Sequence, residues 1–199
     1  MAKIIGITGG VGAGKSAVLC YLSQAYGYSV IQADQVAHEV KEKGTPCYEA
    51  LVELLGEDIL DGEGQINRCK MADVIFKEPD KLRQVNELIH PAVQEVLLQA
   101  MAEEDGAYLF IEAALLIESG YLPYLDELWY IYADEEVRRK RLEQDRGYSI
   151  HKTDDIFASQ LTDEEYRSYK PVVIDNSQAR ENAFHQIDKI LEGCYEAER

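Results

Sequence analysis

Residues 9–16 read GGVGAGKS, and this stretch decides the fold. It matches the P-loop pattern G-x-x-x-x-G-K-[ST] at every fixed position, with the β-prone run KIIGIT before it and a helical pattern from Lys15 to Ala25 after it. Glycines let backbone N–H groups turn inward around a phosphate, and the helix start adds a favourable dipole. In such a loop the lysine places its charge on the β- and γ-phosphate oxygens, and the hydroxyl of Ser16 binds Mg²⁺. The predicted ATP-binding residues are Val11, Gly12, Ala13, Gly14, Lys15 and Ser16.

Strand and helix patterns alternate along the rest of the chain. The β-prone runs are YSVIQA, which leads to Asp34, then AYLFIEA, LWYIYAD and PVVIDNS. This alternation predicts an α/β fold, a three-layer P-loop NTPase core with a parallel sheet, built from about residues 1–35, 105–135 and 170–199. The helical stretch of about residues 36–104 is too long for a simple crossover and is predicted to be an inserted helical subdomain. Residues 136–169 are predicted to form a helical lid.

The composition restricts partners and location. The chain has 20 Lys and Arg against 37 Asp and Glu, a formal charge of −17, and contains no run rich in Lys and Arg. We therefore expect no binding to nucleic acid or to anionic membranes. No window approaches the ~20 apolar residues of a membrane span, and the N-terminus does not resemble a signal peptide, so we expect a cytoplasmic protein. The four cysteines lack metal-ligand spacing and are expected to be reduced.

Among P-loop proteins, a small-molecule kinase fits better than a GTPase. The GTPase-like letters at residues 61–64 fall between helices, and those at residues 151–154 fall in a polar region. Asp34 instead follows the second predicted strand, at the end of a parallel sheet where ligands bind. There it could accept a proton from an acceptor hydroxyl. It could equally cap a helix that begins near Val36, and the spacing does not separate these roles.

The run RRKR at residues 138–141 is the densest positive cluster in the chain. Arginines on a lid helix would stabilise the charge of a transferring phosphoryl group. The alternative is a solvated helix face, paired with Glu135, Glu136 and Glu143. For any single member the solvated face is the simpler interpretation, but we expect at least one of the four to act on phosphate.

Six stretches carry a more specific signal, namely IIGITGGVGAGKS, VIQADQVAHEV, KGTPCYEAL, LIHP at residues 88–91, ALLIESG at residues 114–120, and VVIDNS. In their order and spacing they resemble the dephospho-coenzyme A kinase family over nearly the whole chain. The resemblance implies a P-loop core, a helical substrate-binding domain for the CoA-like acceptor, and an arginine-bearing lid. It also implies Mg²⁺-dependent transfer of the ATP γ-phosphate to the ribose 3′-hydroxyl of dephospho-CoA, the last step of coenzyme A biosynthesis.

The resemblance assigns roles to individual residues. Asp34, Lys15 and Arg141 match catalytic positions of the family. The residues implied at the acceptor are Thr8, Asp34, His90 and Leu115. His90 has an alternative, because a histidine before Pro91 could simply close the preceding helix.

Glu112 ends the third predicted strand, and from its position we expect it to order Mg²⁺-bound water. Its alternative is a plain carboxylate at a strand end.

Several positions depart from the family pattern. Gln32 stands where the family commonly has aspartate, and Ala114 stands where it has proline. An expected Arg-Asp pair in the lid is reversed as Asp145-Arg146, and Tyr169 replaces a second lid arginine, with Arg167 and Lys170 nearby. Two rivals therefore stay open: a kinase of another small alcohol or nucleotide, and an ATP-binding regulator without turnover.

Overall fold

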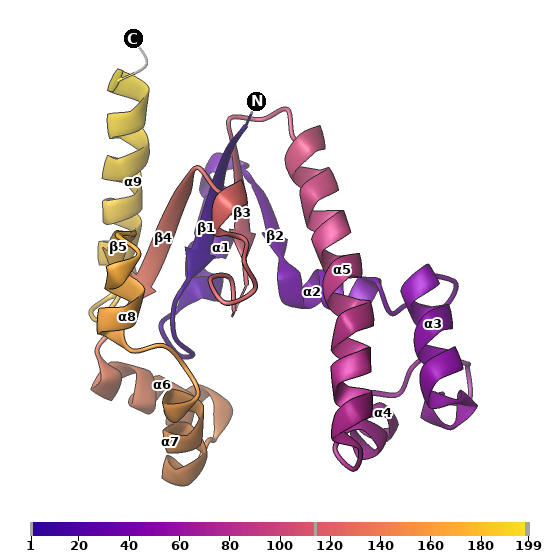
Figure 1. The fold of residues 1–199 in the computed structure, drawn as a ribbon. Coiled ribbons are helices and arrows are strands. Elements are labelled where there is room, and N and C mark those ends of the chain that lie inside the picture. Colours follow the sequence, from indigo (N-terminus) through magenta and orange to yellow (C-terminus); the bar gives the residue numbers. More distant parts are fainter. Residues whose placement is uncertain (1, 114, 198–199) are drawn as a thin grey trace. The chain divides into compact units, whose positions relative to one another are not determined.

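The chain forms a β-sheet flanked by helices, and residues 31–104 form a second, helical unit (Figure 1). The computed structural model describes residues 2–113 and 115–197. They divide into two compact units, one made of residues 1–30 and 105–199 and the other of residues 31–104. The helical unit begins slightly before the predicted insertion, and the functions predicted for the insertion and the lid stay predictions.

Five strands make up the sheet within the described residues, in the order β2-β3-β1-β4-β5. Their bounds are Lys3–Thr8 for β1, Ser29–Gln32 for β2, Tyr108–Glu112 for β3, Glu127–Tyr132 for β4 and Val172–Asp175 for β5. β1 lies between β3 and β4 and pairs with both in parallel, and β4 pairs in parallel with β5. The carboxyl ends of these strands therefore meet at one edge of the sheet, which is where ligands bind in such folds.

One face of the sheet packs against α1 (Lys15–Tyr26) and α9 (Arg180–Ala197). Their apolar residues join Ile5, Phe110 and Trp129 in a single buried core. On the other face Tyr130 of β4 stacks on Tyr166 of α8 (Asp163–Ser168), with ring centroids 4.6 Å apart. The predicted α/β P-loop kinase fold with a parallel sheet is confirmed.

The predicted lid region forms α6 (Glu135–Arg146), α7 (Ile150–Ala158) and α8. Local sequence explains where these helices start. Ser149 accepts a hydrogen bond from the backbone of Lys152 at the start of α7, and Thr162 forms a reciprocal capping box with Glu165 at the start of α8. Gly147 ends α6 in a left-handed conformation.

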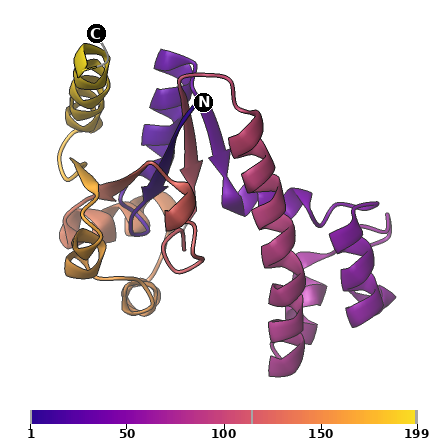
Figure 2. The ribbon, with the colours of Figure 1, turned by 45° about the horizontal axis from the view of Figure 1, so that its top comes forward.

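The second unit contains α2 (Ala33–Glu39), α3 (Pro46–Leu55), η1 (Glu57–Ile59), α4 (Arg68–Ile75) and α5 (Pro79–Glu103). In Figure 2, α5 is one continuous helix. The Thr45 side chain caps α3, with Pro46 at its first position, and Asn67 caps α4. None of the helices described is long and apolar enough to cross a membrane.

Two sequence interpretations in this unit were wrong. α2 begins at Ala33 and not near Val36, so Asp34 lies in the first helical turn and does not cap the helix. α5 continues through Pro91, so His90 does not close a helix. Proline removes one backbone hydrogen bond, but Pro91 is exposed, where water can satisfy the carbonyl that loses its partner.

Candidate active site

The loop of residues 9–16 joins the carboxyl end of β1 to the start of α1, as its sequence predicts. Gly12 and Gly14 have φ values of 83° and 94°, in the left-handed region that favours glycine. A Cβ at Gly14 would also collide with the side-chain amide of Asn176. Glycine at these positions is therefore required both by the backbone turn and by the close packing around it.

Lys15 is the first residue of α1, and its ammonium group lies inside the loop. Its Nζ donates a hydrogen bond of 2.8 Å to the carbonyl of Gly9 and lies 3.6 Å from Oε1 of Glu112. Glu112 is the last residue of β3, opposite Ile7 of β1, and only 13% of its side chain is exposed, as for Lys15. The structure thus brings the predicted lysine and the predicted metal-ordering carboxylate together.

The residues that could hold Mg²⁺ are a hydroxyl and a carboxylate. Ser16 is exposed beside Lys15, and Glu112 faces the same lysine. Mg²⁺ prefers hard oxygen donors and commonly uses one or two protein ligands together with substrate phosphates and water, so this donor set fits the ion. Within the described residues, no three or more His, Cys, Asp or Glu lie together as a metal cluster.

Arg138 connects the lid to the phosphate loop. Its Nε donates to the carbonyl of Val11 at 2.9 Å, and its Nη2 donates to Oε1 of Gln160 at 2.9 Å. The same oxygen of Gln160 accepts the backbone N–H of Val11 at 3.1 Å. The guanidinium carbon also lies 4.1 Å from the centroid of the Phe157 ring, a cation–π contact. Burial lowers the pKa of Arg138, so this guanidinium is desolvated and depends on these partners.

Arg141, the predicted catalytic arginine, lies one helical turn further along α6. It donates to three backbone carbonyls, those of Gly12, Ala13 and Asn176, at 3.3, 3.4 and 2.8 Å. Asn176 is 3% exposed, and its Nδ2 donates to the carbonyl of Ala13 at 2.7 Å. Arg141 and Asn176 therefore fix the loop carbonyls on one side, which leaves the N–H side of the loop for an anion.

The members of the RRKR run lie in different surroundings, and the expected action on phosphate stays a prediction. Arg138 and Arg141 contact the phosphate loop, whereas Arg139 pairs with Glu135 and Asp154 at 2.8 and 2.6 Å. Lys140 is exposed. The solvated-face interpretation therefore applies to Arg139.

Thr8 ends β1 and is almost fully buried, with 1% exposure. Its side chain lies next to Tyr166 of α8. Burial is the main cause of the raised pKa of Tyr166, which stays neutral near pH 7. Thr8 thus connects the carboxyl end of β1 with α8.

The other predicted site residues are exposed. Asp34 is the second residue of α2, and His90 lies on α5 in a groove of about 570 Å³ that also involves Asn86 and Pro91. Leu115 is 55% exposed in the turn after β3, and the neighbouring departure at Ala114 lies outside the described residues.

The lid departures are also on the surface. Arg167 pairs with Asp163 at 2.9 Å, and Tyr169 is 46% exposed. Asp145 and Arg146 are exposed at the end of α6. Arg167, close to the position of the missing lid arginine, is therefore engaged with a carboxylate on its own helix.

Comparisons with known proteins place this geometry in a family. The family model described as dephospho-CoA kinase matches residues 3–182. A dephospho-CoA kinase from Streptococcus mutans is 39% identical over 193 residues, covering 96% of this chain and 97% of the relative. The chain belongs to the dephospho-CoA kinase family. A second dephospho-CoA kinase, from Streptococcus pyogenes serotype M3, is 36% identical over 190 residues, covering 94% of this chain and 96% of the relative.

Solved structures share the fold of this chain. A protein from Thermus thermophilus superposes with a TM-score of 0.80 at 28% identity, covering 96% of this chain and 97% of the other. The dephospho-CoA kinase from Campylobacter jejuni gives a TM-score of 0.73 at 22% identity, covering 97% and 99%. Shikimate kinase from Acinetobacter baumannii, in complex with shikimate, gives 0.53 at 17% identity, covering 97% and 95%. At their low identities the last two show the fold alone.

In this member of the dephospho-CoA kinase family, three residues that contact the phosphate loop were not singled out from the sequence. Arg138 was only one of four basic residues, although it shares a helix face with Arg141 at a spacing of three. Asn176 lay inside the VVIDNS stretch without an assigned role. Gln160 had no sequence signal, because its contact with Val11 joins segments far apart in the chain.

Proposed function

We propose that this chain transfers the γ-phosphate of ATP to the ribose 3′-hydroxyl of dephospho-CoA. The observation that carries the proposal is a complete P-loop, with Lys15 directed into it, in a chain matched by the dephospho-CoA kinase model from residue 3 to 182. A kinase of another small alcohol or nucleotide and a regulator without turnover are less consistent with that match. The roles of individual residues below are part of the proposal.

On the ATP side, the loop N–H groups would surround the phosphates while Lys15 exchanges its bond to Gly9 for the β- and γ-phosphate oxygens. Ser16 and Glu112 would hold Mg²⁺, which supplies positive charge to the phosphate oxygens when bound. Arg141 lies on the carbonyl side of the loop and would contribute positive potential to the transferring group.

On the acceptor side, Asp34 would be the general base. The 3′-oxygen attacks the γ-phosphorus, the new P–O bond forms as the bond to ADP breaks, and the hydroxyl proton passes to the carboxylate. Asp34 is exposed in the first turn of α2, where a substrate hydroxyl can reach it.

The test is ADP release from Mg²⁺-ATP with dephospho-CoA, adenosine, AMP or no acceptor. We expect ADP with dephospho-CoA, and a loss of about 10²-fold or more in kcat for Asp34→Asn, the size of a general-base contribution. The matched control is Asp73→Asn, which removes an exposed carboxylate of α4 in the same unit and should leave the rate unchanged. Turnover only with another acceptor would refute the substrate, and ATP binding without any turnover would favour the regulator.

A further inference from the structure

A basic pocket lies entirely within the second unit. Its volume is about 200 Å³. It is lined by His38, Lys41, Glu42, Gln65, Ile66, Arg68 and Met71. Two of these residues, Lys41 and Arg68, carry basic side chains in a chain whose formal charge is −17, so the pocket is a local exception to the acidic surface.

The two cations of the basic pocket influence each other. Burial and the nearby Arg68 guanidinium lower the pKa of Lys41. Among residues 31–104, all of which the structure describes, no carboxylate oxygen lies within 4.0 Å of the side-chain nitrogens of Lys41 or Arg68. Glu42 lines the same pocket but is exposed. Two like charges held together without a counter-charge are unfavourable in isolation and favour an anion between them.

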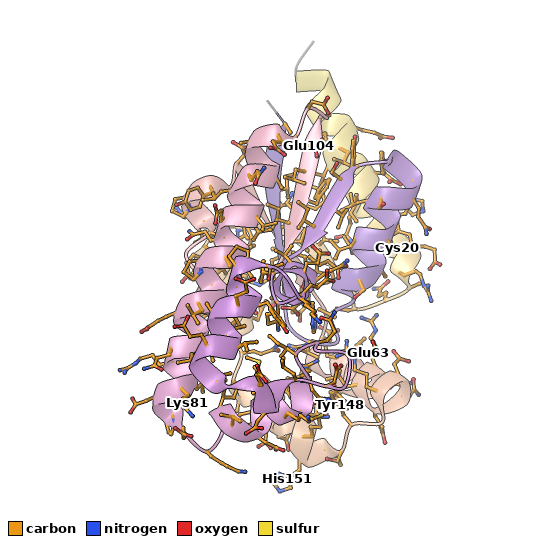
Figure 3. All side chains as sticks on the ribbon, turned by 90° about the vertical axis from the view of Figure 1, so that its right-hand side faces the viewer. Cys20, Glu63, Lys81, Glu104, Tyr148 and His151 are labelled. Atoms are coloured by element: carbon orange, nitrogen blue, oxygen red, sulfur yellow. The ribbon has the colours of Figure 1, made fainter. Side chains whose placement is uncertain are left out.

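Other cations of this unit behave differently. Lys81 pairs with Glu78 at 3.0 Å, and Arg83 pairs with Asp80 at 3.3 Å, both on the exposed surface of α5. Figure 3 labels Lys81 near the N-terminal end of this helix. Lys70 donates to the carbonyl of Leu60. Arg68 and Lys41 are therefore the pair that the structure selects.

We propose that the basic pocket binds the pyrophosphate of dephospho-CoA. The proposal rests on the proposed function, because it assigns a place to the most highly charged part of that acceptor. Arg68 presents a planar fork of N–H donors that matches phosphate oxygens, and Lys41 adds a point charge. The Gln65 side chain could donate a further hydrogen bond from the pocket wall.

The position of the basic pocket along α2 agrees with the geometry of the acceptor. Asp34, His38 and Lys41 are spaced by four and three residues, so they follow one face of the helix and the turn that continues it. Seven residues of helix span about 10 Å. In dephospho-CoA the 3′-hydroxyl and the 5′-pyrophosphate sit on one ribose, so an acceptor with its hydroxyl at Asp34 can place its pyrophosphate along this face.

The experiment measures steady-state kinetics of Lys41→Gln and Arg68→Gln with dephospho-CoA and with adenosine, which lacks the pyrophosphate. We expect each change to raise the KM for dephospho-CoA about tenfold or more, the effect of losing one charge-assisted hydrogen bond. The KM for ATP should stay the same, and so should any turnover of adenosine. Inorganic pyrophosphate should compete with dephospho-CoA in the wild type and about tenfold more weakly in both variants.

The control is Lys81→Gln, which removes one positive charge from the same unit without touching the basic pocket. An unchanged KM for dephospho-CoA in both pocket variants would refute the subsite while the proposed function stands. Weaker pyrophosphate inhibition with an unchanged KM would show an anion pocket unrelated to the acceptor, which also refutes it. Absence of wild-type turnover with dephospho-CoA would refute the proposed function itself, a separate result. A similar KM increase in Lys81→Gln would show a general charge effect and overturn the assignment.

Discussion

Replacing Arg138 by alanine should weaken the contact between α6 and the phosphate loop. The change removes hydrogen bonds of 2.9 Å to the carbonyl of Val11 and to Gln160, and the contact with the Phe157 ring. A hydrogen bond from a charged donor is worth about 1.5–3 kcal/mol and a partly desolvated cation–π contact about 1–2 kcal/mol. The wild type bears the desolvation cost of burying the guanidinium, which the variant avoids, and this offsets part of the sum and leaves a net loss of about 2 kcal/mol.

That loss has two measurable consequences. In a domain of this size 1 kcal/mol shifts Tm by about 2–4 °C, so Arg138→Ala should lower Tm by about 4–8 °C. The loop must then be ordered by the nucleotide itself at a cost of about 0.5–1.5 kcal/mol, which should raise the KM for ATP roughly three- to tenfold. Thermal unfolding followed by circular dichroism and initial rates at varied ATP measure the two effects.

The neighbouring arginine provides a matched control. Arg139→Ala removes the same side chain from the next position of α6, where it forms exposed ion pairs with Glu135 and Asp154. Exposed ion pairs contribute little, so Tm and the KM for ATP should stay close to wild type. If both variants shift Tm equally, or if Arg138→Ala leaves the KM for ATP unchanged, the contact between lid and loop does not stabilise the site.

Two further predictions follow from close packing and from charge. Gly10→Ala would place a Cβ where the Arg138 guanidinium lies. The substitution should therefore lower the Tm of the wild type but have little effect on the Tm of the Arg138→Ala variant. Additive Tm shifts in this double-mutant cycle would contradict the close contact between Gly10 and Arg138. Burial alone would raise the pKa of Asp188, but hydrogen bonds from Tyr21 and Tyr26 outweigh it and lower that pKa. The ionised carboxylate of Asp188 therefore stabilises the fold above about pH 4, and this stabilisation is lost as the pH falls. Asp188→Asn should lower the Tm at pH 7 by more than at pH 3. The same decrease in Tm at both pH values would contradict this.

The sequence was sufficient for the features that depend on local patterns. The P-loop, the strand periodicity and the long helical stretch predicted the fold, because glycine geometry and hydrophobic spacing are short-range signals. The start of α2 and the path of α5 through Pro91 were missed because only local preferences were available there. A preference for capping at Asp34 or for a break at proline is a weak local effect, which tertiary packing and exposure override.

The candidate site was predictable only in part. Lys15 and Glu112 follow from the motif and from the strand end, and the structure brings them together. The contacts of Gln160 and Asn176 with the loop are set by the folding of the lid and of β5 against β1 and β4. Such long-range pairs have no spacing that a single sequence can display.

The way in which cations are held explains how so acidic a chain can bind a polyanion. Arg138 and Arg141 are fixed by loop carbonyls. A carbonyl orients a cation with a hydrogen bond but carries no net charge, so the positive potential at the loop survives. A carboxylate partner, as at Arg139, would cancel it.

The same distinction applies in the second unit. Lys43 and Lys70 donate to the carbonyls of Glu63 and Leu60, and Lys41 and Arg68 have no carboxylate within 4.0 Å among the described residues 31–104. Lys41 and Arg68 therefore leave positive potential in the basic pocket, whereas the charge of Lys81 on α5 is neutralised by Glu78. An acidic enzyme can in this way repel polyanions in general and still attract one at selected places, since the field near a site depends on the nearest unpaired charges more than on net charge.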